Sequence, residues 1–141
     1  MQAAVLKDNS KAADIFISGV KGVHSVINGL YSPTQETGQD GRILYRRSGE
    51  RGDEALCIEH FEGRWRVKNE SDRGSGACRA YVEGGCVLED CRSRTWNVDW
   101  NGSFFFAEPS VRMATGEEAR SQASGRSVLA REHTRASPSM L

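Results

Sequence analysis

The chain has 141 residues, with 19 basic and 19 acidic side chains that leave no formal charge. This length suits one small domain with a single core, and the mixed charges give no sustained positive field to attract nucleic acid. The longest apolar runs, at 15–17 and 104–106, are far shorter than the roughly 20 residues of a membrane-spanning helix. We therefore expect a soluble domain without a membrane span.

The first 13 residues form a polar lead. Lys7 and Asp8 stand where a signal peptide would have its apolar segment, and no small-residue cleavage site follows. We expect this lead to be flexible, and we place the protein in the cytoplasm by default because no targeting signal is seen. The β-rich domain is predicted to span residues 14–114.

Short β-branched and aromatic runs punctuated by glycine begin at Asp14, a pattern typical of strands joined by turns. About nine strands are predicted, at 15–18, 27–31, 42–47, 55–61, 64–69, 77–82, 95–100, 103–107 and 110–113. No segment between them is long enough for an amphipathic helix. The expected fold class is all-β, mainly antiparallel, as a small sandwich or barrel of short strands and hairpins.

Two hairpins give the strongest local signals. Glu62-Gly63 links the strands on either side of it, and its glycine supplies the positive φ of a two-residue turn. Asn101-Gly102 does the same for the later pair, because both residues tolerate the left-handed region.

Alternation along each strand assigns the inward-facing side chains. Trp65 and Val67 are predicted to face the core. In the second hairpin one buried aromatic face is predicted, and it comprises Trp96, Val98 and Trp100 with Phe104 and Phe106 paired across from them. Phe105 lies on the opposite side of its strand, which makes it a candidate for exposure.

Polar, glycine-containing stretches at 32–41, 48–54 and 83–94 predict loops that carry specificity. After Met113 the aromatic residues stop, and Ser, Ala, Arg, Glu and Gly dominate. Such a segment buries too little apolar area to offset its chain entropy. Residues 115–141 are therefore predicted to be a disordered or weakly helical tail, with 116–121 as its helical part.

A zinc site would need two close pairs of sulfur or nitrogen ligands. The chain offers one such set, made of Cys57, His60, Cys86 and Cys91. Residues three apart on a regular strand point to opposite faces. Cys57 and His60 could therefore bind one zinc ion only at a bulge or at the end of a strand. We expect no metal, no cofactor and free thiols in a reducing cytoplasm. A disulfide between Cys86 and Cys91, or between Cys78 and either of them, is left open as an alternative.

The residue types needed for catalysis are present but not grouped. His24, His60 and His133 fall in a loop, a strand and the tail, and nothing in the pattern pairs them with a nucleophile. We assign no catalytic residue and expect a protein that is not an enzyme.

Arg42, Arg46 and Arg47 alternate with apolar residues on one predicted strand. The pattern admits two interpretations, contact with phosphate or an edge strand that protects itself with charge. The edge strand is the favoured one.

A set of spaced landmarks extends over about 95 residues of the chain. It comprises Ile17-Ser18-Gly19, the stretch from Ile27 to Glu36, Leu44-Tyr45, Arg64-Trp65-x-Val67, Ala80-Tyr81 and Trp96-x-Val98. These landmarks resemble a tryptophan-containing β module that recurs in uncharacterised proteins of dinoflagellates, microalgae and other protists. The resemblance implies an accessory or protein-interaction module without catalytic residues, and here Cys57 stands where it implies an aromatic residue.

Our first hypothesis is a non-catalytic protein-interaction or scaffold module, best suited to be an accessory subunit of a larger assembly with another protein as its partner. The alternative is a carbohydrate- or small-ligand-binding, even hydrolytic, domain in which Trp100 or Tyr81 presents a ring to a sugar beside Asp99. The candidate binding residues for both hypotheses are Tyr81, Trp100, Phe105, Arg46 and Arg47.

Overall fold

The computed structural model describes residues 12–47, 55–84, 87–99 and 104–125. Within them, nine strands form one antiparallel sheet, and the predicted all-β, antiparallel fold is confirmed. The strands are β1 (Ile15–Ser18), β2 (Gly29–Thr37), β3 (Ile43–Arg47), β4 (Leu56–Phe61), β5 (Arg64–Asn69), β6 (Ala80–Glu83), β7 (Trp96–Asp99), β8 (Phe105–Glu108) and β9 (Arg112–Thr115).

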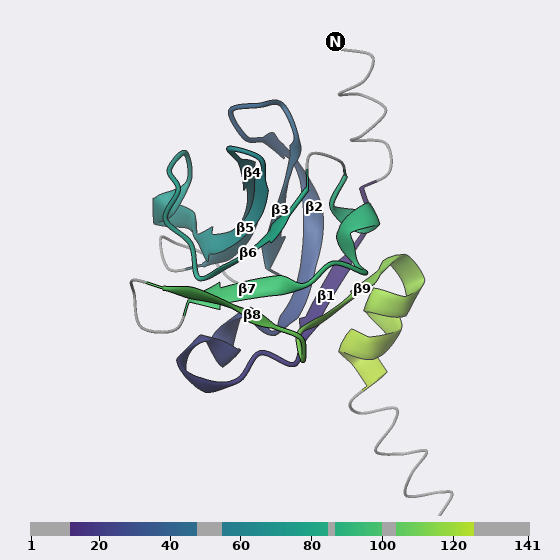
Figure 1. Ribbon diagram of the computed structural model, residues 1–141. Helices are drawn as coiled ribbons and strands as arrows, with labels where there is room; N and C mark the ends of the chain where they lie inside the picture. The colour runs from purple at the N-terminus through teal and green to yellow at the C-terminus, as the bar shows by residue number, and fades with distance from the viewer. Residues whose placement is uncertain (1–11, 48–54, 85–86, 100–103, 126–141) are drawn as a thin grey trace, which may run out of the picture.

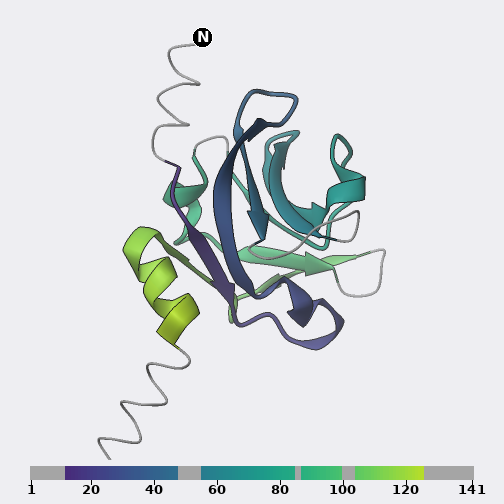
Figure 2. The same ribbon diagram turned by 180° about the vertical axis from the view of Figure 1, so that it is seen from behind.

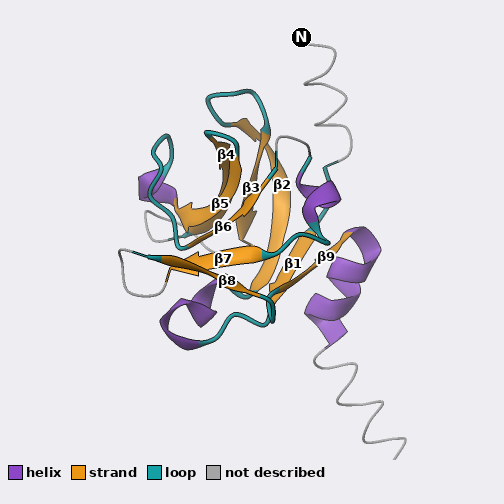
Figure 3. Ribbon diagram, viewed as in Figure 1, coloured by secondary structure: helices purple, strands orange, loops and turns teal. Residues whose placement is uncertain are grey.

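The sheet is a meander from β1 to β8, and β9 returns to pair with β1. It curls around its own inner face, so that β8 and β9 form its two edges (Figure 1). In the connections that the structure describes there are three short 3-10 helices: η1 (Gly22–Ile27), η2 (Glu70–Asp72) and η3 (Leu88–Cys91). Figure 3 separates these helices from the strands and loops.

The inner face of the curled sheet holds the main core. Tyr45, Ile58, Val67 and Ala80 lie in one row across four neighbouring strands, and all four are buried. Because antiparallel neighbours on one face pack directly against each other, this row is the unit of sheet stabilisation. The inward orientation predicted for Val67, and for Trp65 in the next row, is confirmed.

A helix over residues 116–125 follows β9. It packs beside β1 and β9 on the outside of the sheet (Figure 2). Ala119 is fully buried there in a small second cluster with Phe16 and Ala114. This part of the segment predicted as a tail therefore belongs to the packed structure, and 126–141 lie outside the described residues.

The predicted loop at 32–41 is wrong over most of its length, because β2 continues to Thr37. Pro33 lies within this strand opposite Tyr45, and the register shifts between Pro33 and Thr37. The Thr34 hydroxyl donates to the Leu44 carbonyl at 2.8 Å, so a side chain bonds the neighbouring strand where the ladder is irregular.

The outer face of β4 and β5 carries a buried ion pair. Lys68 Nζ lies 2.8 Å from Glu59 Oε1, and both side chains are buried. Lys68 also donates to the Ser75 carbonyl, while the Gly74 N–H donates to Glu59 at 3.0 Å. These hydrogen bonds hold the glycine-rich turn after η2 over the ion pair. The Gly74 N–H is already bonded to Glu59.

No helix among the described residues is long and apolar enough to cross a membrane.

Candidate binding site

Three consecutive phenylalanines stand at the β8 edge of the sheet. Phe104, Phe105 and Phe106, hereafter the aromatic edge, expose 61%, 38% and 54% of their surface. The exposure predicted for Phe105 is confirmed, whereas the burial predicted for Phe104 and Phe106 is wrong. Among the described strands β8 pairs only with β7, so no further strand covers these rings.

Phe105 and Tyr81 meet on the outer face of the sheet. Their ring centroids are 5.1 Å apart, and Arg64 Cζ lies 4.1 Å from the centroid of the Tyr81 ring. Arg64 is itself held by Glu83 at 3.1 Å. The Tyr81 ring is therefore engaged by an aromatic and a cationic neighbour, which leaves little of it for the sugar contact predicted in the alternative hypothesis.

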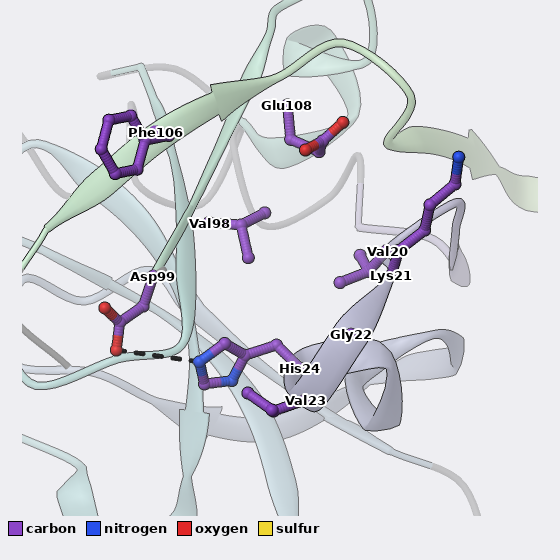
Figure 4. Close-up of a pocket in the computed structure, with 9 residues that line it drawn as sticks. All are labelled: Val20, Lys21, Gly22, Val23, His24, Val98, Asp99, Phe106 and Glu108. Carbon is purple, nitrogen blue, oxygen red and sulfur yellow. Dashed lines mark ion pairs between the residues drawn. The ribbon is translucent and has the colours of Figure 1, made fainter. Parts of the chain in front are cut away.

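A pocket of about 570 Å³ lies between η1 and the β7–β8 hairpin. This edge pocket is lined by Val20, Lys21, Gly22, Val23, His24, Val98, Asp99, Phe106 and Glu108. Figure 4 shows aliphatic and aromatic groups between the charged ones. Phe106 belongs both to the aromatic edge and to the pocket wall, so the two features form one continuous candidate site.

His24 is the titratable centre of the edge pocket. Its Nε2 lies 3.7 Å from Asp99 Oδ2, and its Nδ1 lies 3.4 Å from Arg79 Nη1. A guanidinium only donates, so Nδ1 accepts and the ring proton sits on Nε2, facing the carboxylate. Burial and then Arg79 lower the pKa of His24, against the opposing effect of Asp99, and the ring is neutral at pH 7.

The lining of the edge pocket does not pair its histidine with a hydroxyl or thiol nucleophile. No Ser, Thr, Cys or Tyr is among the nine residues that line it, and the distance of 3.7 Å between His24 and Asp99 is too long for a hydrogen bond. Its geometry suits binding through apolar walls with a few polar groups.

The two arginines predicted as binding residues, Arg46 and Arg47, form hydrogen bonds within the fold. Arg46 donates to Glu70 at 2.7 Å and to Glu36 at 2.8 Å, and Arg47 donates to the Val26 carbonyl. Their strand, β3, lies between β2 and β4. The favoured interpretation of this strand as a charged edge is therefore wrong, and the charges serve a surface network instead.

The candidate zinc ligands are not brought together. In the β4–β5 ladder, Cys57 lies opposite Lys68 on the outer face, whereas His60 lies opposite Trp65 on the inner face. Burial raises the pKa of Cys57 to about 12, so it stays a thiol. Cys91 lies in the core and Cys86 lies outside the described residues, as does Trp100. In the described part of the chain no group of three His, Cys, Asp or Glu side chains is placed to hold a metal ion.

His60 fastens two loops from the inner rim of β4. Its Nδ1 contacts Asp40 Oδ2, and its Nε2 donates to the Gly84 carbonyl at 2.8 Å. Its ring also meets Trp65 edge-on at 4.9 Å. Both ring nitrogens are thus occupied, which gives this histidine a structural position.

Comparison of the chain with known protein families, curated proteins and solved structures finds no match. The resemblance to a protist β module therefore stays a prediction.

The edge pocket has no recognisable signal in the sequence. His24 lies in a predicted loop and Asp99 on a predicted strand 75 positions later, and no local pattern links two residues so far apart. The one available signal was the Phe104-Phe105-Phe106 run, which marked the strand but not the pocket beside it.

Proposed function

We propose that this protein is a non-catalytic protein-interaction module and that it binds an extended segment of a partner protein along β8. The proposal rests on one observation, the exposure of three consecutive phenylalanines at the start of an edge strand, two of them within it. Large exposed apolar groups that are contiguous mark interaction surfaces, and aromatic residues are enriched in such surfaces.

An extended partner suits this surface because an edge strand is a template for pairing with another strand. Natural proteins protect such edges with lysine, proline or bulges. The other edge of this sheet, β9, carries an exposed arginine, Arg112, and leads into the packed helix. β8 has neither lysine nor proline within it. Its alternating side chains would present Phe105 on one face and Phe106 on the other.

The first test is the size of the native assembly. We expect untagged protein from its native source to elute from size exclusion in a complex, well ahead of the 15.5 kDa monomer, with partners identified by mass spectrometry. The purified partner should then slow amide hydrogen exchange over residues 104–108. Elution as a free monomer would count against an accessory subunit.

A double variant tests whether β8 is the docking surface. Phe104→Ser/Phe105→Ser should abolish binding of the identified partner, while Val26→Ser, at an exposed apolar residue outside the edge pocket, should leave binding unchanged. A partner that binds the double variant as tightly as the wild type would place its contact elsewhere.

A further inference from the structure

We infer that a second pocket, beside β9, binds the phosphate monoester group of a ligand. This arginine pocket has a volume of about 310 Å³ and lies between residues 92–95 and 109–113. Arg92, Arg94 and Arg112 line it. The inference does not depend on docking along β8, because none of the three arginines belongs to β8 or lines the edge pocket.

The guanidinium groups of the arginine pocket have no carboxylate partner in the described structure. Arg92 and Arg112 form no hydrogen bond or ion pair with any described residue. Arg94 donates only to the Glu83 carbonyl, at 3.4 Å. No Asp or Glu is among the eight described residues that line the pocket, so its positive charge is not balanced there.

Arginines elsewhere in the described ranges are bonded within the fold. Those from Arg42 to Arg79 and Arg120 each have at least one hydrogen bond or ion pair. The three arginines without a carboxylate or a close carbonyl acceptor are therefore gathered around one pocket. Protection of the sheet edge by charge accounts for Arg112 on β9, but not for the two arginines that face it from 92–94.

Carboxylates near the arginine pocket along the chain have other positions. Glu89 accepts hydrogen bonds from the Tyr45 hydroxyl at 2.7 Å and from the Ala13 N–H at 2.9 Å. Glu108 accepts from the Ser110 hydroxyl and lines the edge pocket. Asp90 is exposed and does not line the arginine pocket. Like charges held together without a counter-ion repel each other, and a bound anion would remove that repulsion.

The donors of the arginine pocket suit phosphate better than a carboxylate. Guanidinium groups bind phosphate oxygens through paired N–H donors, and Ser93 and Thr95 place two hydroxyl residues in the same lining. A phosphate monoester carries close to two negative charges and three acceptor oxygens, whereas a carboxylate has one charge and two oxygens. The chain as a whole has no net charge to attract a long polyanion, so a single phosphate group fits best.

The arginine pocket is tested first with small probes at constant ionic strength, because salt screens exposed charges. In NMR titrations of the whole chain, glycerol 3-phosphate should shift the amide signals of Ser93, Thr95 and Arg112 and reach saturation. Acetate should bind about tenfold more weakly or worse, and glycerol should not bind. Equal affinity for acetate, or the same shifts with sodium chloride, would overturn the inference.

Variants assign the binding to its residues. Arg92→Gln and Arg112→Gln should each weaken glycerol 3-phosphate binding by about tenfold. Lys21→Gln is the matched control, because it removes the same charge from an exposed residue that lines the edge pocket, and it should leave binding unchanged. Thermal unfolding shows whether each variant is folded, and the probes on the wild type remain decisive if one is not. Equal loss in all three variants would overturn the site.

The source of the phosphate, a small molecule or a phosphorylated serine of a partner, is separated by a second series. Tighter binding of a glycine-flanked phosphoserine peptide than of glycerol 3-phosphate, lost without the phosphate, supports a protein source. Equal or weaker binding of the peptide supports a small molecule. Tighter binding of a short oligonucleotide, in which every phosphate is a diester, would overturn the monoester assignment, and no binding of any probe would overturn the site.

Discussion

Lys68 is the most deeply buried charge in the described structure, with no exposed surface. Its ammonium contacts one carboxylate and the carbonyls of Ser75 and Asp72, and lies 5.3 Å from the centroid of the Phe61 ring. Burying two charges is costly unless both are fully bonded. Lys68, Glu59 and the turn that covers them therefore contribute to the stability of the fold as one unit.

Removing one member of this pair should be strongly destabilising. We expect Lys68→Met to lower the free energy of unfolding by about 3–5 kcal/mol, because Glu59 is left as an uncompensated buried charge. The double variant Lys68→Met/Glu59→Gln should regain part of that loss. Urea denaturation measures both, and a double variant no more stable than the single one would contradict the argument.

His24 predicts a dependence of stability on pH. Burial and Arg79 hold the folded pKa of His24 below the ordinary histidine value of about 6.5, so between that value and the lower folded pKa the unfolded chain binds a proton that the folded chain does not. Stability therefore falls as the pH drops through this window. The pKa is measured by NMR titration of the ring, and urea denaturation should show a smaller loss in His24→Gln than in the wild type. A His24 that titrates above 6.5 would refute the assignment.

At the scale of single elements, the β4–β5 hairpin combines a confirmed prediction with a local strain. Its two-residue turn has φ of 50° at Glu62 and 80° at Gly63. Glutamate rarely adopts this left-handed region, at a cost of about 1–2 kcal/mol, whereas asparagine adopts it readily.

We expect Glu62→Asn to raise the free energy of unfolding by about 1 kcal/mol, and Gly63→Ala to lower it by a similar amount. Nothing lies within 4 Å of a Cβ added at Gly63, so the second effect reports backbone conformation alone. Thermal unfolding of both variants measures the effects, and changes of the same sign would mean that the turn is not of this type.

Most strands could be predicted because the information that specifies them is local. β1 and β5 begin and end where alternation and the turn residues place them. β2 was cut short because Pro33 and its polar neighbours are typical of a loop, and only the pairing with β3 makes them a strand. Likewise, Phe104 and Phe106 would be buried only if another strand lay beyond β8. The sequence of a single strand does not predict which strands lie beside it in the sheet.

The candidate site was less predictable for the same reason. Val20 and His24 follow β1, whereas Val98 and Glu108 come from the last hairpin. They meet only because the meander curls until its eighth strand faces the connection after its first. Sequence periodicity reports which way a side chain points, and not which distant element it meets.

At the scale of the whole molecule, one corner links the two edges of the sheet. The chain turns between β8 and β9 at 109–111, where the Ser110 hydroxyl donates to the Gly19 carbonyl at 3.0 Å. A Cβ built on Gly19 would lie 2.0 Å from the Ser110 carbonyl oxygen, and the φ of Gly19 is 87°. The end of β1 can approach this corner only without a side chain.

Gly19→Ala should therefore destabilise the protein by more than the conformational cost of about 1–2 kcal/mol. Gly22→Ala is the matched control, because Gly22 has a φ of 78° but nothing within 4 Å of an added Cβ. The difference between the two losses, measured by urea denaturation, isolates the close approach. Equal losses in the free energy of unfolding would mean that the chain at 109–111 shifts to accommodate the added Cβ at no cost.

The pairing of β1 with β9 also sets the order in which the protein can be completed as it is made. Ile15 pairs with Thr115, so β1 waits for a strand that is translated about a hundred residues later. At roughly 5–20 residues per second, one side of β1 stays unpaired for about 5–20 seconds after it is made. A nascent chain halted before β9 would expose the unpaired backbone groups on that side of β1, a template for pairing with another chain.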